Sequence, residues 1–332
     1  MKNWQETETI YQRLNTLTAH GEAAALAVIV GIEGSTYRRP GAKLLIEADG
    51  RMIGNVSGGC LEQDVRETAL SILKTGEARR VHYDTSDEED KVWGMGLGCN
   101  GKVDLFIQRI TPEEHTALIE EVCVLLQGDN PVAIRVDLEG DRSGRLSLVD
   151  PSETCTEWKG AVFTEHLNPP PVFLICGAGE DAIPLARMAH EIGFRVALAD
   201  HRAAYLTSER FPWARKRVKA RPEESLDELS INPHTLAVVK THTLSHDAAW
   251  VNRLLETEVP YIGLLGPRDR RDEIRNRVDP AQQARIYGPV GLDLGGEGPE
   301  QVALSIVSEA LAVWHGRLPG HLRDRTRAIH SE

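Results

Sequence analysis

The feature of this sequence that most constrains its fold is a strand-length apolar run followed at once by a glycine turn and a helical pattern. Residues 172–176 are apolar, the turn at 177–182 reads GAGEDA, and the segment that continues to residue 192 has helical apolar spacing. In a turn of this kind Gly177 permits a sharp bend, Gly179 lets the backbone approach a pyrophosphate, and a small residue at 182 lets the helix pack on the strand. The pattern predicts one strand–helix unit of a doubly wound parallel sheet.

The rest of the C-terminal half repeats this alternation of short apolar strands with helices. Strands are expected at 195–199, 235–240 and 261–265, with helices at 246–255 and 301–314. Such alternation argues for a parallel sheet covered by helices on both faces, with ligands bound at the carboxyl ends of the strands. Asp200 follows the second strand, where the dinucleotide fingerprint places a carboxylate that holds a ribose diol.

Other residues of this half leave its ligand open. Glu180 and Asp181 place negative charge at the helix start that a pyrophosphate would occupy, which argues against a tight dinucleotide site. His242 and Arg268 follow later strands and could line the same crevice, Arg268 as a phosphate clamp. A hydrogen-bonded structural histidine and a surface ion pair explain these two residues equally well. A nucleotide site and a scaffold that has lost its nucleotide therefore both remain open.

A proline run at 169–171 separates the two halves, because it can continue neither a helix nor a central strand. We expect domains at 1–167 and 172–332, the first of them a mixed α+β domain. Its helices are expected at 3–19, 60–74 and 112–126, and its strands at 24–32, 43–47, 51–56, 80–83 and 102–110. Thr111 and Glu114, with Pro112 at the first helical position, form a capping box for the third helix.

Two glycine-rich loops in the N-terminal half each carry a cysteine, at 57–62 (SGGCLE) and at 93–101 (WGMGLGCNG). Glycine costs backbone entropy, so such runs indicate a sharp turn or a close approach to a ligand. Cys60 follows Gly58 and Gly59 at a predicted helix start, where unpaired amides stabilise an anion and lower the pKa of a thiol. Cys99 follows Gly98 in a loop that could approach a bulky ligand, and its soft thiolate suits a soft metal. Burial of both cysteines as small hydrophobes is the alternative.

The segment at 35–43 (STYRRPGAK) combines hydroxyls with cations beside a predicted strand. Such a composition suits phosphate oxygens, although a solvated loop is the alternative. The candidate ligand residues of this segment are Ser35, Thr36, Arg38, Arg39 and Lys43.

Charge and apolar patterning limit the partners of the chain. Lys and Arg total 38 against 50 Asp and Glu, a net charge of −12, which argues against nucleic acid as a partner. No apolar run approaches the roughly 18 residues of a membrane span, and residues 1–6 lack the apolar core of a signal peptide, so we expect a cytoplasmic protein without membrane contact. Five cysteines without CxxC spacing fit reduced thiols. A homodimer is the default assembly.

Together the segments at 34–43, 57–62, 93–101 and 173–179 resemble the XdhC/CoxI family, the xanthine dehydrogenase accessory proteins, and the resemblance covers essentially the whole chain. Asn100 departs from it, because the family loop most often has a glycine there. The resemblance implies an α+β domain followed by a Rossmann-like domain. It also implies a molybdenum cofactor (molybdopterin) chaperone that protects the cofactor during sulfuration. The implied partners are a cysteine desulfurase and a xanthine dehydrogenase-like enzyme that receives the cofactor.

The resemblance therefore implies an accessory protein, for which we expect no catalytic residue, and no Ser-His-Asp, HExxH or paired-carboxylate signal suggests a hydrolase. The thiols expected to contact molybdenum are Cys60 and Cys99. The residues expected to contact pterin and phosphate oxygens are Ser35, Thr36, Arg38, Arg39, Lys43, Gly58, Gly59 and Gly98. The C-terminal residues expected to bind a nucleotide such as NAD, or the phosphate end of the cofactor, are Gly177, Gly179, Asp200, His242 and Arg268. An NAD(P)-dependent oxidoreductase is the main alternative, although no pattern marks a site of hydride transfer. A structural adaptor is the third.

Overall fold

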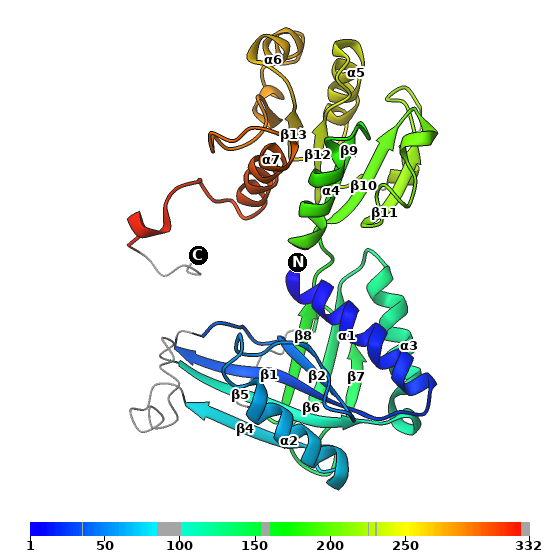
Figure 1. Ribbon diagram of the computed structural model, residues 1–332, viewed down its shortest axis with the longest axis vertical. Helices are drawn as coiled ribbons and strands as arrows, with labels where there is room; N and C mark the ends of the chain where they lie inside the picture. The colour runs from blue at the N-terminus through cyan, green and yellow to red at the C-terminus, as the bar shows by residue number, and fades with distance from the viewer. Residues whose placement is uncertain (35, 85–100, 154–159, 225, 230, 327–332) are drawn as a thin grey trace. The chain divides into compact units, whose positions relative to one another are not determined.

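The computed structural model divides into two compact units, Met1–Pro169 and Pro170–Glu332 (Figure 1). The structure describes residues 1–34, 36–84, 101–153, 160–224, 226–229 and 231–326. Three of the expected site residues, Ser35, Gly98 and Cys99, lie outside these ranges. Each unit has its own hydrophobic core, and each is described by itself.

The described residues of the N-terminal unit form two antiparallel sheets and three α-helices. The larger sheet has the order β3-β2-β1-β5-β4 and the smaller one the order β7-β6-β8. The strands are β1 (Ala24–Gly34), β2 (Lys43–Glu47), β3 (Met52–Gly54), β4 (Arg79–Asp84), β5 (Gly101–Ile110), β6 (Val132–Asp137), β7 (Leu146–Val149) and β8 (Val162–Leu167). The helices are α1 (Lys2–Ala19), α2 (Glu62–Thr75) and α3 (Pro112–Gln127).

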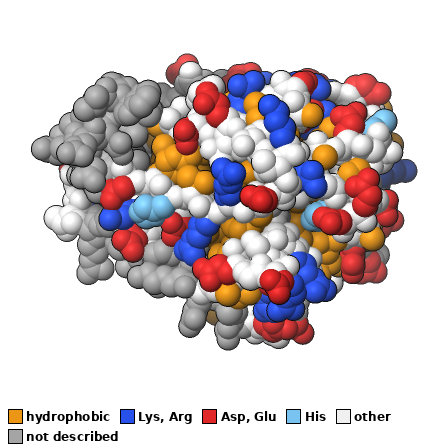
Figure 2. Space-filling model, turned by 90° about the horizontal axis from the view of Figure 1, so that it is seen from below, with side chains coloured by type: hydrophobic (Ala, Val, Ile, Leu, Met, Phe, Trp, Pro, Cys, Tyr) orange, Lys and Arg blue, Asp and Glu red, His pale blue; other side chains and the backbone are white. Residues whose placement is uncertain are grey.

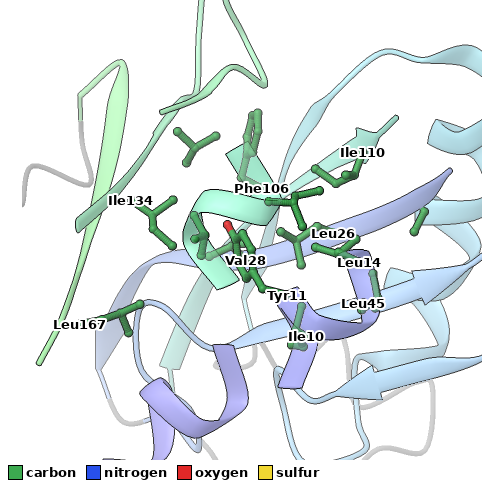
Figure 3. Close-up of a cluster of buried hydrophobic side chains, with 14 of the residues drawn as sticks. Ile10, Tyr11, Leu14, Leu26, Val28, Leu45, Phe106, Ile110, Ile134 and Leu167 are labelled. Atoms are coloured by element: carbon green, nitrogen blue, oxygen red, sulfur yellow. The ribbon is translucent and has the colours of Figure 1, made fainter. Parts of the chain in front are cut away.

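Strand β1 is buried on both faces, which explains why its sequence is almost continuously apolar. Leu26 and Val28 face a cluster that includes α1, α3 and the smaller sheet, while Ala25 and Ala27 share a second cluster with α2. Figure 3 shows the first cluster, in which side chains of α1 meet those of β1, β5 and the smaller sheet. The larger sheet is thus covered by a hydrophobic core on each face.

The C-terminal unit is a six-stranded, wholly parallel sheet with the order β11-β10-β9-β12-β13-β14. Its strands are β9 (Val172–Cys176), β10 (Arg195–Asp200), β11 (Ala214–Lys219), β12 (Thr235–Val239), β13 (Tyr261–Leu264) and β14 (Ile286–Tyr287). Its helices are α4 (Ala182–Glu191), α5 (Leu244–Leu255), α6 (Arg268–Arg275) and α7 (Pro299–Trp314). The chain leaves the sheet centre in both directions from β9, so the point where strand order reverses lies between β9 and β12. The predicted fold class is confirmed.

Helices cover the parallel sheet as the sequence predicts. Val251 and Leu254 of α5 share a core with Leu174 and Ala237 of the sheet, while α4 packs against α7 (Figure 1). Strand β11 forms one edge of the sheet and carries four cations: Arg215, Lys216, Arg217 and Lys219. No described helix is both long and apolar enough to cross a bilayer.

Two local predictions need correction. The second helix begins at Glu62 rather than at Cys60, so Cys60 lies in the loop that precedes it. The third helix begins where expected, but Thr111 makes no side-chain cap. Its backbone amide instead donates to Nδ1 of His115 at 3.2 Å, so the ring of His115 takes the role that the capping box assigns to the carboxylate of Glu114. The left-handed Gly76, with φ of 81°, ends α2.

Candidate functional site

The N-terminal motifs meet at one end of the larger sheet. Gly34, the last residue of β1, pairs with Gly101, the first residue of β5 and the last of the second glycine loop. Gly58 lies against the ring of Tyr37, because a Cβ built on Gly58 would be 3.0 Å from two carbons of that ring. The structure therefore brings the cation-rich segment next to the first glycine loop and next to the end of the second.

The loop that precedes α2 is closed by a carboxylate of the helix itself. Glu62 Oε1 accepts hydrogen bonds from the amides of Val56 (3.1 Å) and Ser57 (2.8 Å). Glu62 Oε2 accepts from the amide of Gly59 at 2.9 Å and from the hydroxyl of Ser57. The sequence predicts that such donors stabilise a Cys60 thiolate or a bound oxyanion. They are occupied by Glu62 instead.

The pKa of Glu62 shows which effect dominates in this loop. Burial acts to raise the pKa, but the hydrogen bonds from Ser57 and from the loop amides outweigh burial and bring it below the ordinary value. The ionised carboxylate is thus part of the folded loop at neutral pH. It holds the loop in shape around Cys60.

Cys60 is a half-buried free thiol on this closed loop. Its neighbour Gly59 has φ of 121°, and a Cβ there would meet no atom within 4 Å, so the backbone beside the thiol opens on free space. Burial raises the pKa of Cys123 and raises that of Cys176 well above its ordinary value. Among the described cysteines, Cys60 is the one placed beside an open glycine backbone.

The cations of the 35–43 segment have different surroundings. Lys43 is buried and donates to Thr7 Oγ1 (2.8 Å), the Gly41 carbonyl (2.8 Å) and Glu165 Oε1 (2.6 Å). All three ammonium protons are therefore used inside the unit, which weighs against the expected contact of Lys43 with a cofactor. Arg38 also pairs within the unit, with Glu6.

Two residues of the same segment keep their side chains at the surface. Arg39 is exposed and makes no side-chain hydrogen bond within the part of the chain that the structure describes. The ring of Tyr37 is 69% exposed although it lies against Gly58. Thr36 is half-buried, and its hydroxyl donates to the carbonyl of Arg38 at 2.8 Å, which shapes the turn. Arg39 and Tyr37 therefore offer a cation and an aromatic face beside the Cys60 loop.

In the C-terminal unit, the turn after β9 requires the glycine that the sequence places there. Gly177 has φ of 115°, and a Cβ on it would be 2.5 Å from the carbonyl oxygen of Lys240. Its amide donates to the carbonyl of Ala199 at 2.8 Å. A Cβ on Gly179 would be 2.9 Å from Oδ1 of Asp181. The turn is thus wedged between the ends of β10 and β12.

Asp200 has a structural partner in place of a ribose. Its Oδ2 accepts from the Ala178 amide (2.8 Å) and from Nη2 of Arg202 (2.8 Å), and its Oδ1 accepts from the amide (2.8 Å) and Nε (3.0 Å) of Arg202. Burial acts to raise the pKa of Asp200, but these hydrogen bonds lower it to about 2. The carboxylate has no acceptor position left for a ribose diol, which weighs against the role expected for it.

The acidic residues at the start of α4 are neutralised within the unit. Asp181 pairs with Lys240 (2.6 Å) and with Nε2 of His242 (3.0 Å), and Glu180 pairs with Arg210 (2.5 Å). Burial lowers the pKa of Lys240, and burial of Asp181 is outweighed by Lys240, which leaves the pKa of Asp181 below its usual value. These acids therefore repel a phosphate less strongly than their positions in the sequence suggest.

His242 and Arg268 are placed differently by the structure. His242 has a left-handed backbone with φ of 62°, uncommon outside glycine, and its ring reaches Asp181 at the start of α4. Arg268 begins α6 and is exposed. Arg270 is the arginine that turns inward, donating to the fully buried Asp247 at 3.1 Å. The structure brings His242, but not Arg268, to the glycine turn.

Two pockets lie at the carboxyl ends of the parallel strands. One of about 260 Å³ is lined by residues that include Asp200, Arg202, Arg221, His246 and Trp250. The other, of about 250 Å³, is lined by the Asp181–Lys240 pair and by apolar residues of α7. The sequence motifs do not single out Arg202, Arg221 or His246, although Arg202 stands only two residues beyond Asp200 and could be recognised as its partner.

No described cluster of three or more His, Cys, Asp and Glu side chains is arranged to hold a metal ion. On the face drawn in Figure 2, acidic and basic side chains are interspersed and neither sign gathers into one field. The structure is thus an α/β protein in which one unit carries the thiol of Cys60 beside the open backbone of Gly59. The other unit has a crevice at the carboxyl ends of its parallel strands, the place where nucleotides bind in folds of this type.

Two family models match this chain. Residues 173–310 match the XdhC Rossmann domain, and residues 17–84 match the XdhC and CoxI family. A probable xanthine dehydrogenase component of Bacillus subtilis is 36% identical over 90% of this chain and 95% of that protein. The chain therefore belongs to the XdhC and CoxI family.

Two further relatives extend the comparison. The molybdenum cofactor insertion chaperone PaoD of Escherichia coli is 24% identical over 88% of this chain and 84% of its own. A crystal structure of a xanthine dehydrogenase from Bacillus halodurans superposes with a TM-score of 0.77 and 28% identity, covering 93% of this chain and 96% of the other. These similarities extend across both units of the chain.

Proposed function

We propose that this protein binds molybdenum cofactor, protects it during sulfuration and inserts it into a xanthine dehydrogenase-like enzyme. The observation that carries the proposal is the meeting of Tyr37, Gly58 and Cys60 beside the Gly34–Gly101 pair. The relative named as a molybdenum cofactor insertion chaperone supports the same role. A chaperone needs an accessible binding surface rather than a closed reaction chamber, and the open backbone at Gly59 supplies one.

Each residue of this site suits a different part of the cofactor. The thiolate of Cys60 suits molybdenum or a sulfur atom in transit, because soft ligands favour soft centres. Arg39, an exposed guanidinium, suits pterin or phosphate oxygens. Cys99 and Ser35, which lie outside the described residues, complete the set that the sequence assigns. Lys43 and Arg38 hold the loop instead of the cargo.

The partners follow from the same proposal. A cysteine desulfurase would supply the sulfur, and a xanthine dehydrogenase-like enzyme would receive the sulfurated cofactor. The relative from Bacillus subtilis, named as a probable component of xanthine dehydrogenase, supports an enzyme of this type as the recipient. A homodimer in the cytoplasm remains our expectation for the assembly.

An NAD(P)-dependent oxidoreductase is the second candidate, favoured by the parallel sheet and by the glycine turn at Gly177. The occupied acceptors of Asp200 weigh against NAD, because no carboxylate oxygen is left for its ribose diol. Dehydrogenase assays with purines and aldehydes, run with NAD and NADP, should show no turnover. Turnover with either coenzyme would support the oxidoreductase instead.

Cofactor retention tests the chaperone proposal. Protein purified from a molybdenum-sufficient host should carry molybdenum and pterin, measured by metal analysis and by fluorescence of the oxidised pterin. Cys60→Ala and Cys99→Ala should each lower both severalfold, and should slow activation of an apo-enzyme of the xanthine dehydrogenase type. Cys123→Ala is the matched control and should change neither, because that thiol is on α3 and packs against the core. Equal retention in all four proteins would exclude both thiols from the role.

A further inference from the structure

The pocket between β10, β11 and α5 has no role in the proposed cofactor function. It lies at the carboxyl ends of the parallel strands and is lined by residues that include Gly177, Asp200, Arg202, Arg221, His246 and Trp250. Its volume is about 260 Å³. Sites for drug-sized ligands begin at about 300 Å³. The pocket therefore has room for one nucleoside rather than for a whole dinucleotide.

The buried carboxylate of the lining has no acceptor position left for a free ribose diol. The only buried carboxylate in it, among the described residues, is Asp200, and the four hydrogen bonds from Ala178 and Arg202 saturate its oxygens. The carboxylate is 2% exposed and lies behind the guanidinium of Arg202. Asp200 thus presents a neutral pair to a ligand, not a negative charge.

Arg202 is held ready to bind an anion. Its guanidinium carbon lies 4.0 Å from the centre of the Tyr205 ring, while Nε and Nη2 are fixed on Asp200. Its Nη1 makes no hydrogen bond in the described chain, and the side chain is 40% exposed. A guanidinium locked on one edge and one face offers its remaining edge with little loss of conformational entropy.

A second arginine and two imidazoles surround the same space. Arg221 is exposed, and its guanidinium has no hydrogen-bond partner within the described residues. The rings of His201 and His246 meet edge to face, with centroids 5.4 Å apart. The opposing charge in the lining is Glu223, which is exposed to solvent and therefore screened. The arrangement suits a phosphate monoester, which takes forked hydrogen bonds from arginine.

The remaining lining is apolar and suits a base. Trp250 is 3% exposed and Ala199 and Ala220 are buried, so the indole and two methyl groups form an apolar wall. An aromatic wall with a cationic rim is the combination that binds a nucleoside phosphate, since the base stacks and the phosphate pairs.

We propose that this pocket binds a nucleotide whose ribose carries a phosphate monoester on its 2′ or 3′ hydroxyl, rather than a nucleotide with a free ribose diol. Because its oxygens are occupied, Asp200 cannot accept hydrogen bonds from a ribose diol. Arg202 and Arg221 instead offer two guanidinium groups to a phosphate. The inference rests on the parallel sheet of the C-terminal unit. It does not depend on cofactor binding by the N-terminal unit, so either proposal can fail without the other.

Positional isomers of adenosine monophosphate test the proposal directly, because they share base, charge and size. In titration calorimetry on the full chain, 2′-AMP or 3′-AMP should bind at least about tenfold more tightly than 5′-AMP, a difference of about 1.4 kcal/mol. Inorganic phosphate should bind more weakly than either, because it lacks the base. Equal affinity for 5′-AMP, equal affinity for inorganic phosphate, or no binding of any isomer would each overturn the proposal.

Two substitutions with opposite expected effects on affinity, together with one control, locate the binding site. Arg221→Met should lower the affinity for the preferred isomer about tenfold, because it removes a charge-assisted hydrogen bond. Glu223→Gln should raise that affinity a few-fold by removing the one opposing charge. Arg253→Met is the control, since Arg253 pairs with Glu256 on the exposed side of α5 and should leave affinity unchanged. All three side chains are exposed enough that folding is preserved, which circular dichroism checks. An unchanged affinity in Arg221→Met would place the ligand elsewhere.

Discussion

Glu62 sets the shape of the Cys60 loop by accepting hydrogen bonds from the amides of Val56, Ser57 and Gly59 and from the Ser57 hydroxyl. The lowered pKa of Glu62 means that the ionised form favours the folded loop. A carboxylate with a lowered pKa contributes stability above its ordinary range and loses it as the pH falls through its folded-state pKa. The loop should therefore loosen in acid and remain closed at neutral pH.

Hydrogen exchange at the loop amides checks this. At neutral pH, Glu62→Gln should lower the protection factors of Ser57 and Gly59 about tenfold, corresponding to about 1.4 kcal/mol. The native protein should lose the same protection as the pH falls below 4.5, the ordinary value for the group. Glu67→Gln, on an exposed face of the same helix, is the control and should leave both amides protected. If Glu62→Gln still lost amide protection as the pH falls, the acid-induced loss would have to be assigned to another titratable group.

Single residues are where the sequence predicts least. Lys43 and Glu62 have partners that no motif indicates, because Glu165 lies 122 positions from Lys43 and the loop amides belong to the backbone. The partner of Asp200, Arg202, stands only two residues away and is the easier one to recognise. Composition identifies groups capable of binding anions. It does not indicate which of them are already paired, because that depends on side-chain geometry in three dimensions.

At the scale of elements, the Lys43–Glu165 pair joins β2 to β8 inside the N-terminal unit. Breaking one side of a buried pair leaves an uncompensated charge and costs about 3–5 kcal/mol, whereas replacing both partners with apolar groups is close to neutral. Lys43→Met should therefore lower the melting temperature of this unit strongly. Lys43→Met combined with Glu165→Leu should recover most of the loss.

The comparison is made by thermal unfolding of the full chain with a surface pair as control. Asp49→Asn breaks a pair with Arg51 in which both side chains are more than half exposed, and it should have little effect. If the double variant were as unstable as Lys43→Met alone, the salt bridge would not explain the loss. If Lys43→Met is destabilised as expected, a loss of bound cofactor in this variant should be attributed to impaired folding of the N-terminal unit and not to a lost contact with the cofactor.

Elements are predicted well because their signals are local. The apolar run of β1, the glycine after α2 and the proline that begins α3 each act within a few residues, and β1 and α3 begin where they are expected. The start of α2 is shifted by two residues because Glu62, from inside the helix, reaches back to the loop. A sequence pattern cannot show that a side chain reaches from inside a helix back to the loop before it.

At the scale of the whole molecule, each unit has a separate core, and we expect separate unfolding transitions. Calorimetry of the full chain should show two peaks. Lys43→Met should shift one peak, and Gly177→Ala the other, because a Cβ at Gly177 would lie 2.5 Å from a carbonyl oxygen. In the combined variant both shifts should appear and add. A single peak that moves in both variants would mean that the units unfold together.

The four cations of β11 have a consequence for assembly. A strand at the edge of a sheet offers unpaired amides and carbonyls to any second strand that approaches. Two copies of β11 placed side by side would bring Arg215, Lys216, Arg217 and Lys219 against the same like-charged row. The opposite edge, β14, has only two residues, Ile286–Tyr287, and so offers few hydrogen bonds. The parallel sheet is thereby protected at both ends from growing into a fibre, and any pairing of two chains must use another surface.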